Sequence, residues 1–187
     1  MRAFAVIGVL ALTACGPGAE QPGQTRETAN GCPAAAASSW TADDGAVFTI
    51  EASAIGADCA QANAAFSIQN AAGETVWSEA YPVSEVMTLA GAESVEDMQR
   101  RLGEWINPAG AGPDSTGDLP EWAQGEDTPM SGEFPFYVED GLSRSAFEAL
   151  RARDVAMFCY VQGMESVVCL AVDSGELKEI GVQTFPG

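Results

Sequence analysis

Residues 156–172 decide the fold of this chain, and they read AMFCYVQGMESVVCLAV. Two apolar runs flank a short polar linker that contains a glycine, which is typical of two buried strands joined by a turn. When a hairpin is centred on Met164, Cys159 lies directly opposite Cys169, where cross-strand Cβ atoms are about 4.5–5.5 Å apart. The stretch therefore predicts a β-hairpin closed by a Cys159–Cys169 disulfide.

The chain has five cysteines and no histidine. If Cys15 is set aside, four remain, and an even number in an exported chain suggests two disulfides, with three possible connectivities. Local pairing in the hairpin leaves Cys32 to bond Cys59, which would tie the end of the N-terminal tail to the first strand region. No two cysteines form a C-x-x-C pair, and no histidine is present to complete a zinc site, so the sequence predicts no metal site and no cofactor.

Two short helices are predicted upstream of the hairpin. The clearer one begins at Ser94, a capping residue, and is followed by an apolar stripe at spacings of three and four. The stripe consists of Val95, Met98, Leu102 and Trp105. The second runs from Ser143 or Ser145 to Asp154 and buries Phe147 and Leu150.

Alternating or apolar segments predict the remaining strands, and hairpin-length links join most of them. They are residues 47–52, 64–69, 75–81, 155–162, 167–173 and 177–185. We expect an α+β fold, an antiparallel β-sheet domain with two short helices, a long acidic loop and two disulfides.

The N-terminus carries an export pattern. Arg2 precedes an apolar run that is about half the ~20 residues needed to cross a bilayer, and Leu12-Thr13-Ala14-Cys15 follows. This stretch resembles the lipobox of bacterial lipoproteins, in which the cysteine takes a diacylglyceryl group and becomes the new N-terminus. The resemblance covers only the signal. It implies a lipidated Cys15 and, with Gly16 next to it, a final place on the periplasmic face of the outer membrane rather than on the inner membrane.

Three segments follow from this reading. Residues 1–14 are the lipoprotein signal peptide, residues 15–39 are the lipidated cysteine and a flexible tether rich in Gly, Pro, Ala and Ser, and residues 40–187 are a single globular α+β domain.

Composition excludes several functions. With 27 acidic against 8 basic residues, the net charge is −19, which argues against nucleic-acid binding. Without histidine, Ser-His-Asp and Cys-His catalysis is impossible. No Walker loop, G-x-G-x-x-G or G-x-S-x-G motif is present. Carboxylate pairs are the one catalytic class left open, and no catalytic residue is predicted.

The segment Asn107–Pro135 is the predicted acidic loop, with five prolines, five glycines and no basic residue. Pro and Gly are expected to deny it a regular ladder, and its acids to keep it from collapsing onto the acidic body. Three interpretations stay open: a solvated spacer, an arm that docks a basic partner, and a calcium loop, although 114–118 does not match the D-x-[DN]-x-[DN]-G pattern. The candidate partner-binding residues are Asp114, Asp118, Glu121, Trp122, Glu126 and Asp127.

The sequence thus favours a non-enzymatic binding or accessory lipoprotein of the cell envelope, whose acidic surface prefers a basic envelope protein. One concrete form is a shield against cationic proteins such as lysozyme-type hydrolases. The alternative is a carboxylate-dependent accessory hydrolase of the envelope.

Overall fold

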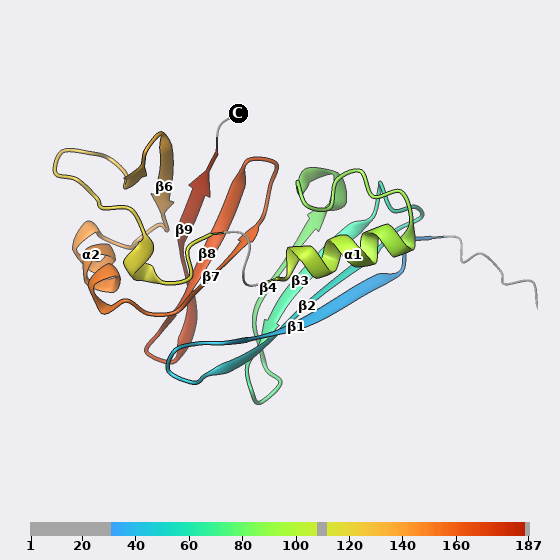
Figure 1. The fold of residues 1–187 in the computed structure, drawn as a ribbon, viewed down its shortest axis with the longest axis horizontal. Helices are drawn as coiled ribbons and strands as arrows, with labels where there is room; N and C mark the ends of the chain where they lie inside the picture. The colour runs from blue at the N-terminus through green and yellow to red at the C-terminus, as the bar shows by residue number, and fades with distance from the viewer. Residues whose placement is uncertain (1–30, 108–111, 186–187) are drawn as a thin grey trace, which may run out of the picture.

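Two antiparallel sheets and two helices build the fold (Figure 1). The computed structural model describes residues 31–107 and 112–185. The first sheet has the order β1-β2-β3-β4 and contains β1 (Ala34–Thr41), β2 (Val47–Ile55), β3 (Asn63–Gln69) and β4 (Thr75–Pro82). The second has the order β5-β6-β9-β8-β7 and contains β5 (Met130–Ser131), β6 (Phe134–Val138), β7 (Met157–Val161), β8 (Ser166–Asp173) and β9 (Glu176–Thr184).

The helices are α1 (Val95–Trp105) and α2 (Arg144–Arg153), with the 3₁₀ turns η1 (Val83–Glu85) and η2 (Thr116–Asp118). α1 lies across one face of the first sheet, and α2 lies beside the second sheet (Figure 1). The α+β class, the antiparallel pairing and both predicted helices are confirmed.

The β7–β8 hairpin has the predicted register, because Cys159 pairs with Cys169 and the two form a disulfide with their Cα atoms 4.1 Å apart. Alternate residues of the hairpin enter two different cores. Phe158 and Tyr160 point into a central core, while Cys159 and Cys169 belong to a second core on the other face. Since both faces are covered, the strands are apolar throughout rather than alternating.

The central core lies between the two sheets and α1, and aromatic rings fill its middle. Phe66 of β3 stacks on Tyr160 of β7 with ring centroids 4.0 Å apart, and Trp105 of α1 packs edge-on against Phe66 at 5.3 Å. Pairs of this kind contribute about 0.5–1.5 kcal/mol beyond their buried area. This aromatic contact joins the first sheet, the second sheet and α1.

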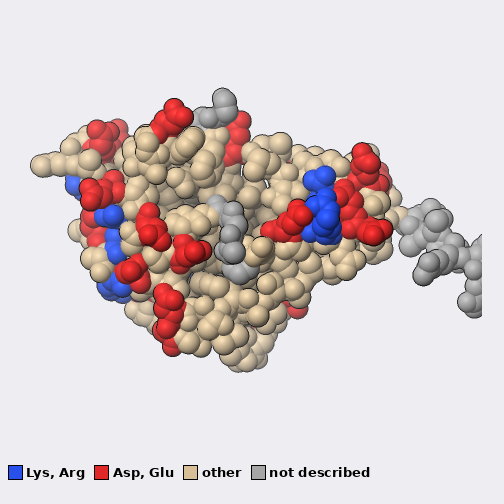
Figure 2. Space-filling view, in the orientation of Figure 1, with Lys and Arg blue, Asp and Glu red and all other residues tan. Residues whose placement is uncertain are grey.

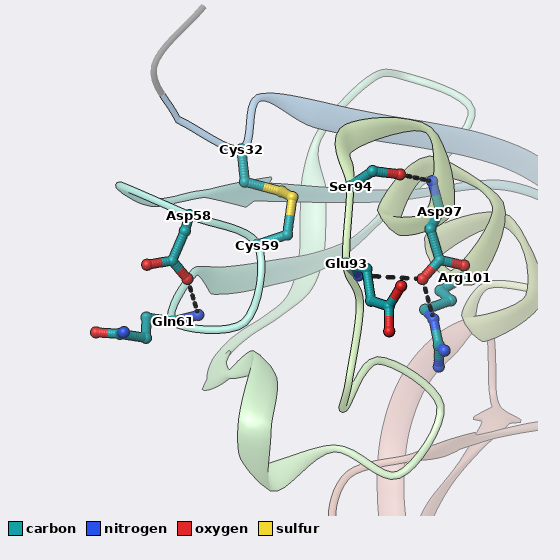
Figure 3. The surroundings of a disulfide bond; sticks show 8 residues. All are labelled: Cys32, Asp58, Cys59, Gln61, Glu93, Ser94, Asp97 and Arg101. Carbon is teal, nitrogen blue, oxygen red and sulfur yellow. Dashed lines mark hydrogen bonds and ion pairs between the residues drawn. A yellow bond between two sulfur atoms is a disulfide. The ribbon is translucent and has the colours of Figure 1, made fainter.

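The start of α1 is fixed as its sequence predicts. The Ser94 hydroxyl accepts a hydrogen bond from the Asp97 amide at 3.1 Å, and the Asp97 carboxylate accepts one from the Arg101 guanidinium at 3.0 Å (Figure 3). Arg101 also donates to the carbonyls of Thr88 and Ala90. These contacts tie the helix to the segment that leads into it.

The second predicted disulfide, Cys32–Cys59, is also confirmed, with the Cα atoms 4.9 Å apart (Figure 3). The Cys32 amide donates to the Gly56 carbonyl at 2.9 Å, and Asp58 accepts from the Gln61 amide within the same turn. The bond fixes the chain immediately before β1.

The tether predicted for residues 15–39 is wrong at its C-terminal end, because β1 begins at Ala34. Alanine and serine have little strand propensity of their own. Here, however, every residue of β1 pairs with β2, and Ala34 is buried in the central core. Pairing with β2, rather than local strand propensity, makes this segment a strand. The predicted signal peptide, residues 1–14, and Cys15 lie outside the described residues.

Candidate functional site

The acidic segment from Gly112 to Glu133 lies against α2 and forms the candidate site. α2 begins after Ser143, whose hydroxyl accepts from the Ala146 amide at 3.3 Å, and ends at Asp154, which has a left-handed φ of 51°. Phe147 and Leu150 face the second core, so the helix is fixed to the sheet beneath it.

Thr116 is the buried anchor of the segment. Its hydroxyl donates to the Leu150 carbonyl at 2.9 Å and accepts from the Val155 amide at 3.0 Å, which satisfies two backbone groups at the end of α2. The Thr116 amide donates to the Val155 carbonyl at 2.9 Å, and the Met157 amide donates to the Asp114 carbonyl at 2.8 Å. Ser115 therefore forms an isolated antiparallel bridge with Ala156, immediately before β7.

Asp154 secures the next turn of the segment. Its carboxylate accepts from the Ser115 hydroxyl at 2.5 Å and from the Gly117 amide at 3.1 Å. A Cβ atom built on Gly117 would lie 2.8 Å from Cγ of Asp154, so the approach leaves no room for a side chain. The glycine is required by this contact.

Leu119 and Trp122 complete the docking onto α2. Leu119 is buried, and its carbonyl accepts from the Arg151 guanidinium at 2.9 Å. The Trp122 ring packs edge-on against Phe147 at 5.8 Å, and its indole N–H donates to the Glu126 carbonyl at 2.9 Å. Trp122 thus fixes the loop to the body.

The expected long acidic loop is present, and residues 119–129 contain no helix or strand, but the expectation that its acids keep it off the body is wrong. Residues 107–135 contain η2 and β5, and β6 begins within them. The loop docks because its inward contacts use backbone groups, a threonine hydroxyl and apolar side chains, while its carboxylates point elsewhere. Like-charge repulsion does not oppose contacts of this kind.

Five of the candidate residues are exposed carboxylates: Asp114, Asp118, Glu121, Glu126 and Asp127. Within residues 31–107 and 112–185, the acidic members of ion pairs are other residues: Asp97, Glu104, Glu148, Asp173 and Glu176. Figure 2 shows red groups, with some blue ones among them, over the left half of the molecule, where α2 and the loop lie, and a further red and blue cluster on the right around α1. The loop carboxylates therefore face solvent on an ordered support.

A second group of carboxylates lines a pocket of about 260 Å³ between the β1–β2 turn and the end of α2. It contains Asp43, Asp44 and Asp154. Asp44 accepts from the Ala46 amide at 2.9 Å, and Asp154 holds the docked loop. These contacts give two of the three carboxylates a structural role. Across the described part of the chain, no three acidic, cysteine or histidine side chains are grouped so that they could hold a metal ion.

Sequence reasoning missed a polar seam where β4 meets the second sheet. The hydroxyl of Tyr160 accepts from the Trp77 indole at 2.9 Å and lies 3.1 Å from the Tyr81 hydroxyl, and burial raises the pKa of Tyr160 well above its usual range. On the second sheet, burial raises the pKa of the Glu179 carboxyl, with a further rise from the neighbouring Glu139. The available signal was the period-two spacing of Trp77, Glu79 and Tyr81.

Comparison with models of known protein families, with curated proteins and with solved structures gives no match to this chain. Among the residues that the structure describes, none of the helices combines the length and apolar character needed to span a membrane. The functional argument therefore depends on the residues themselves.

Proposed function

We propose that this chain is a lipoprotein of a bacterial cell envelope whose folded part binds a basic protein through the docked acidic loop. The export and lipidation part of the proposal is supported by Leu12-Thr13-Ala14-Cys15. Two disulfides among the described residues are consistent with an oxidising compartment. Gly16 supports a position on the periplasmic face of the outer membrane.

One observation carries the binding part of the proposal: the loop is held on α2 by Thr116, Asp154 and Trp122, while its six carboxylates, five of them candidate residues, remain exposed. An ordered loop loses little conformational freedom when a partner binds, so less of the interaction energy is lost on ordering. With a net charge of −19, the molecule also attracts basic partners over a distance.

Lipidation is tested by labelling cells with a palmitate analogue. The wild-type chain takes up the label and the Cys15→Ala variant does not. Equal labelling of the two chains would contradict the lipoprotein assignment, and it would leave the partner-binding proposal to be tested separately.

Partner binding is tested by capture from an envelope extract. The test variant neutralises the loop with Asp114→Asn, Asp118→Asn, Glu121→Gln, Glu126→Gln and Asp127→Asn. The matched control neutralises five exposed carboxylates elsewhere, Asp43, Glu85, Glu93, Glu96 and Glu165, with the same amide replacements. We expect a basic protein to be retained by the wild type and the control, and lost by the loop variant. Identical capture by all three chains would contradict the proposal.

The alternative, a carboxylate-dependent accessory hydrolase of the envelope, is favoured by the pocket that Asp43, Asp44 and Asp154 line. Hydrolysis of a glycosidic bond needs two carboxyl groups facing each other across such a cavity. The test is release of reducing sugar from purified cell wall by the wild type and by Asp43→Asn. Release that is lost in the variant would support the hydrolase over the binding protein.

A further inference from the structure

The face of the first sheet that points away from the central core is nearly free of charge. Along each strand, residues buried in the core alternate with outward residues, and the outward set defines this outer face. It consists of Ala35, Ala37, Ser39, Thr41, Val47, Thr49, Glu51, Ser53, Ile55, Asn63, Ala65, Ser67, Gln69, Thr75, Ser78, Ala80 and Pro82. Glu51 is the one charged residue of the outer face, although the chain has 27 acidic residues.

The shape of the outer face follows from its cross-strand rows. Ala35, Ser53, Ala65 and Ala80 pair with one another across the four strands and make a row of small side chains. A shallow depression of about 390 Å³ covers part of this row and the next one, and its lining includes Ala35, Ala37, Glu51, Ser53, Ala65 and Ser67. One row further along, Ile55 projects with 74% of its surface exposed. A ridge therefore stands next to a groove on the same surface.

We infer that the outer face binds a second copy of this chain, with the Ile55 ridge of each copy packed into the shallow groove of the other, beside Ala35 and Ala65. A two-fold pair brings the same surface of both copies together, so a ridge beside a groove is self-complementary. Sheets that pack face to face approach to about 10 Å, and the small side chains of the row allow that approach.

Charge favours a second copy over a basic partner at this face. Two copies that each carry a net charge of −19 repel one another, so they associate best through a surface with few carboxylates. The outer face offers a single carboxylate per copy, and Glu51 already accepts a hydrogen bond from the Gln69 amide at 3.0 Å. A basic partner would instead find its complement on the acidic loop.

The area of the outer face is small for a stable dimer. Four strands about 4.8 Å apart and about 25 Å long present about 480 Å² in projection, or about 960 Å² for two copies. Specific interfaces begin near about 1,000 Å². We therefore expect a weak dimer, with a Kd in the micromolar range, that becomes tighter as salt screens the repulsion between the copies.

The test is sedimentation velocity of the purified full-length chain in detergent over a concentration series. The Ala65→Glu variant places a carboxylate in the centre of the outer face, and Ala149→Glu makes the same change at an exposed position of α2. We expect a dimer whose Kd rises at least tenfold in Ala65→Glu, is unchanged in Ala149→Glu and falls in Glu51→Gln. At a protein concentration well below the Kd, where all four chains are monomers, the thermal unfolding temperature should be the same for all of them.

A monomer at every concentration, or a dimer that Ala65→Glu leaves intact, would overturn this inference. Such an intact dimer would place the contact elsewhere, for example along the free edge of a strand. The result is independent of partner capture by the loop, because the dimer tightens with salt whereas loop binding weakens.

Discussion

At the scale of single residues, Gly117 shows how closely the acidic loop is fitted to the body. A Cβ atom at this position would meet the Asp154 carboxylate, which also accepts the Gly117 amide. We expect Gly117→Ala to displace Asp154, to break the hydrogen bonds to Ser115 and residue 117, and to lower stability by about 1–3 kcal/mol. Thermal unfolding followed by circular dichroism measures the loss.

The control for this prediction is Gly103→Ala in α1, where a Cβ atom meets nothing within 4 Å. Alanine has a higher helix propensity than glycine, so this variant should be unchanged or more stable by up to about 1 kcal/mol. A Gly117→Ala protein as stable as the Gly103→Ala protein would show that the loop does not depend on the Asp154 contact.

Glu179 gives the molecule a defined dependence on pH. Burial, and then the nearby carboxylates of Glu139 and Glu79, raise the pKa of Glu179 above its ordinary value of 4.5. The folded state therefore holds this proton more tightly than the unfolded state, so the associated stability is fully present below pH 4.5 and is lost as the pH rises through the raised pKa. We expect Glu179→Gln to raise the unfolding temperature at neutral pH by about 1–3 °C.

The same variant should show no gain at about pH 4, where the native carboxyl already holds its proton. Glu133→Gln, at an exposed position of the acidic loop, serves as the control and should shift the unfolding temperature by less than about 1 °C at either pH. A gain that is equal at both pH values would mean that packing, rather than charge, limits stability at the seam.

At the scale of elements, Thr116 determines whether the acidic loop is an ordered part of the fold. Its hydroxyl donates to the Leu150 carbonyl and accepts from the Val155 amide. Because Thr116 is fully buried, water cannot take the place of this hydroxyl. Thr116→Val keeps the shape but leaves these groups unpaired, at a cost of about 1–3 kcal/mol. We expect faster amide hydrogen exchange across residues 112–122 in this variant, and much less change in Thr116→Ser. Equal exchange in the two variants would contradict the role of the hydroxyl.

The elements also show how far local sequence determines this fold. The β7–β8 register, both disulfides and the Ser94 cap could be predicted, because each depends on residues close together or on a clear period. β1 and the docking of the acidic loop could not be predicted from local sequence. β1 becomes a strand through pairing with β2. The loop is held by two hydrogen bonds to main-chain carbonyls, one from Arg151 to Leu119 of the loop and one from Thr116 of the loop to Leu150, and every residue type carries such a carbonyl.

The candidate site could likewise be predicted only in part. The exposed carboxylates of the loop follow from composition, since Asp and Glu are almost never fully buried without a partner and the loop contains no basic residue. Their ordered support does not follow, because Asp154 is 39 residues from Ser115 in the chain. The seam of Trp77, Tyr81, Tyr160 and Glu179 joins two sheets, and no single stretch of sequence contains it.

At the scale of the whole molecule, charge is distributed unevenly, and this separates the two proposed contacts. The acidic loop beside α2 presents several exposed carboxylates that form no ion pair within the described residues, whereas the outer face of the first sheet presents one carboxylate. Salt should act on the two contacts with opposite sign, because it screens attraction to a basic partner and repulsion between copies alike. Ionic strength therefore identifies which surface mediates an observed association.

The most direct test of the central claim is the salt dependence of partner capture by the full-length chain. Capture by the wild type should fall at least tenfold between about 50 and 500 mM NaCl, because exposed charges are screened within a few ångströms at the higher concentration. Capture by the chain with Asp114, Asp118, Glu121, Glu126 and Asp127 neutralised should be weak at both. Equal capture by the wild type at low and high salt would contradict electrostatic docking through the acidic loop.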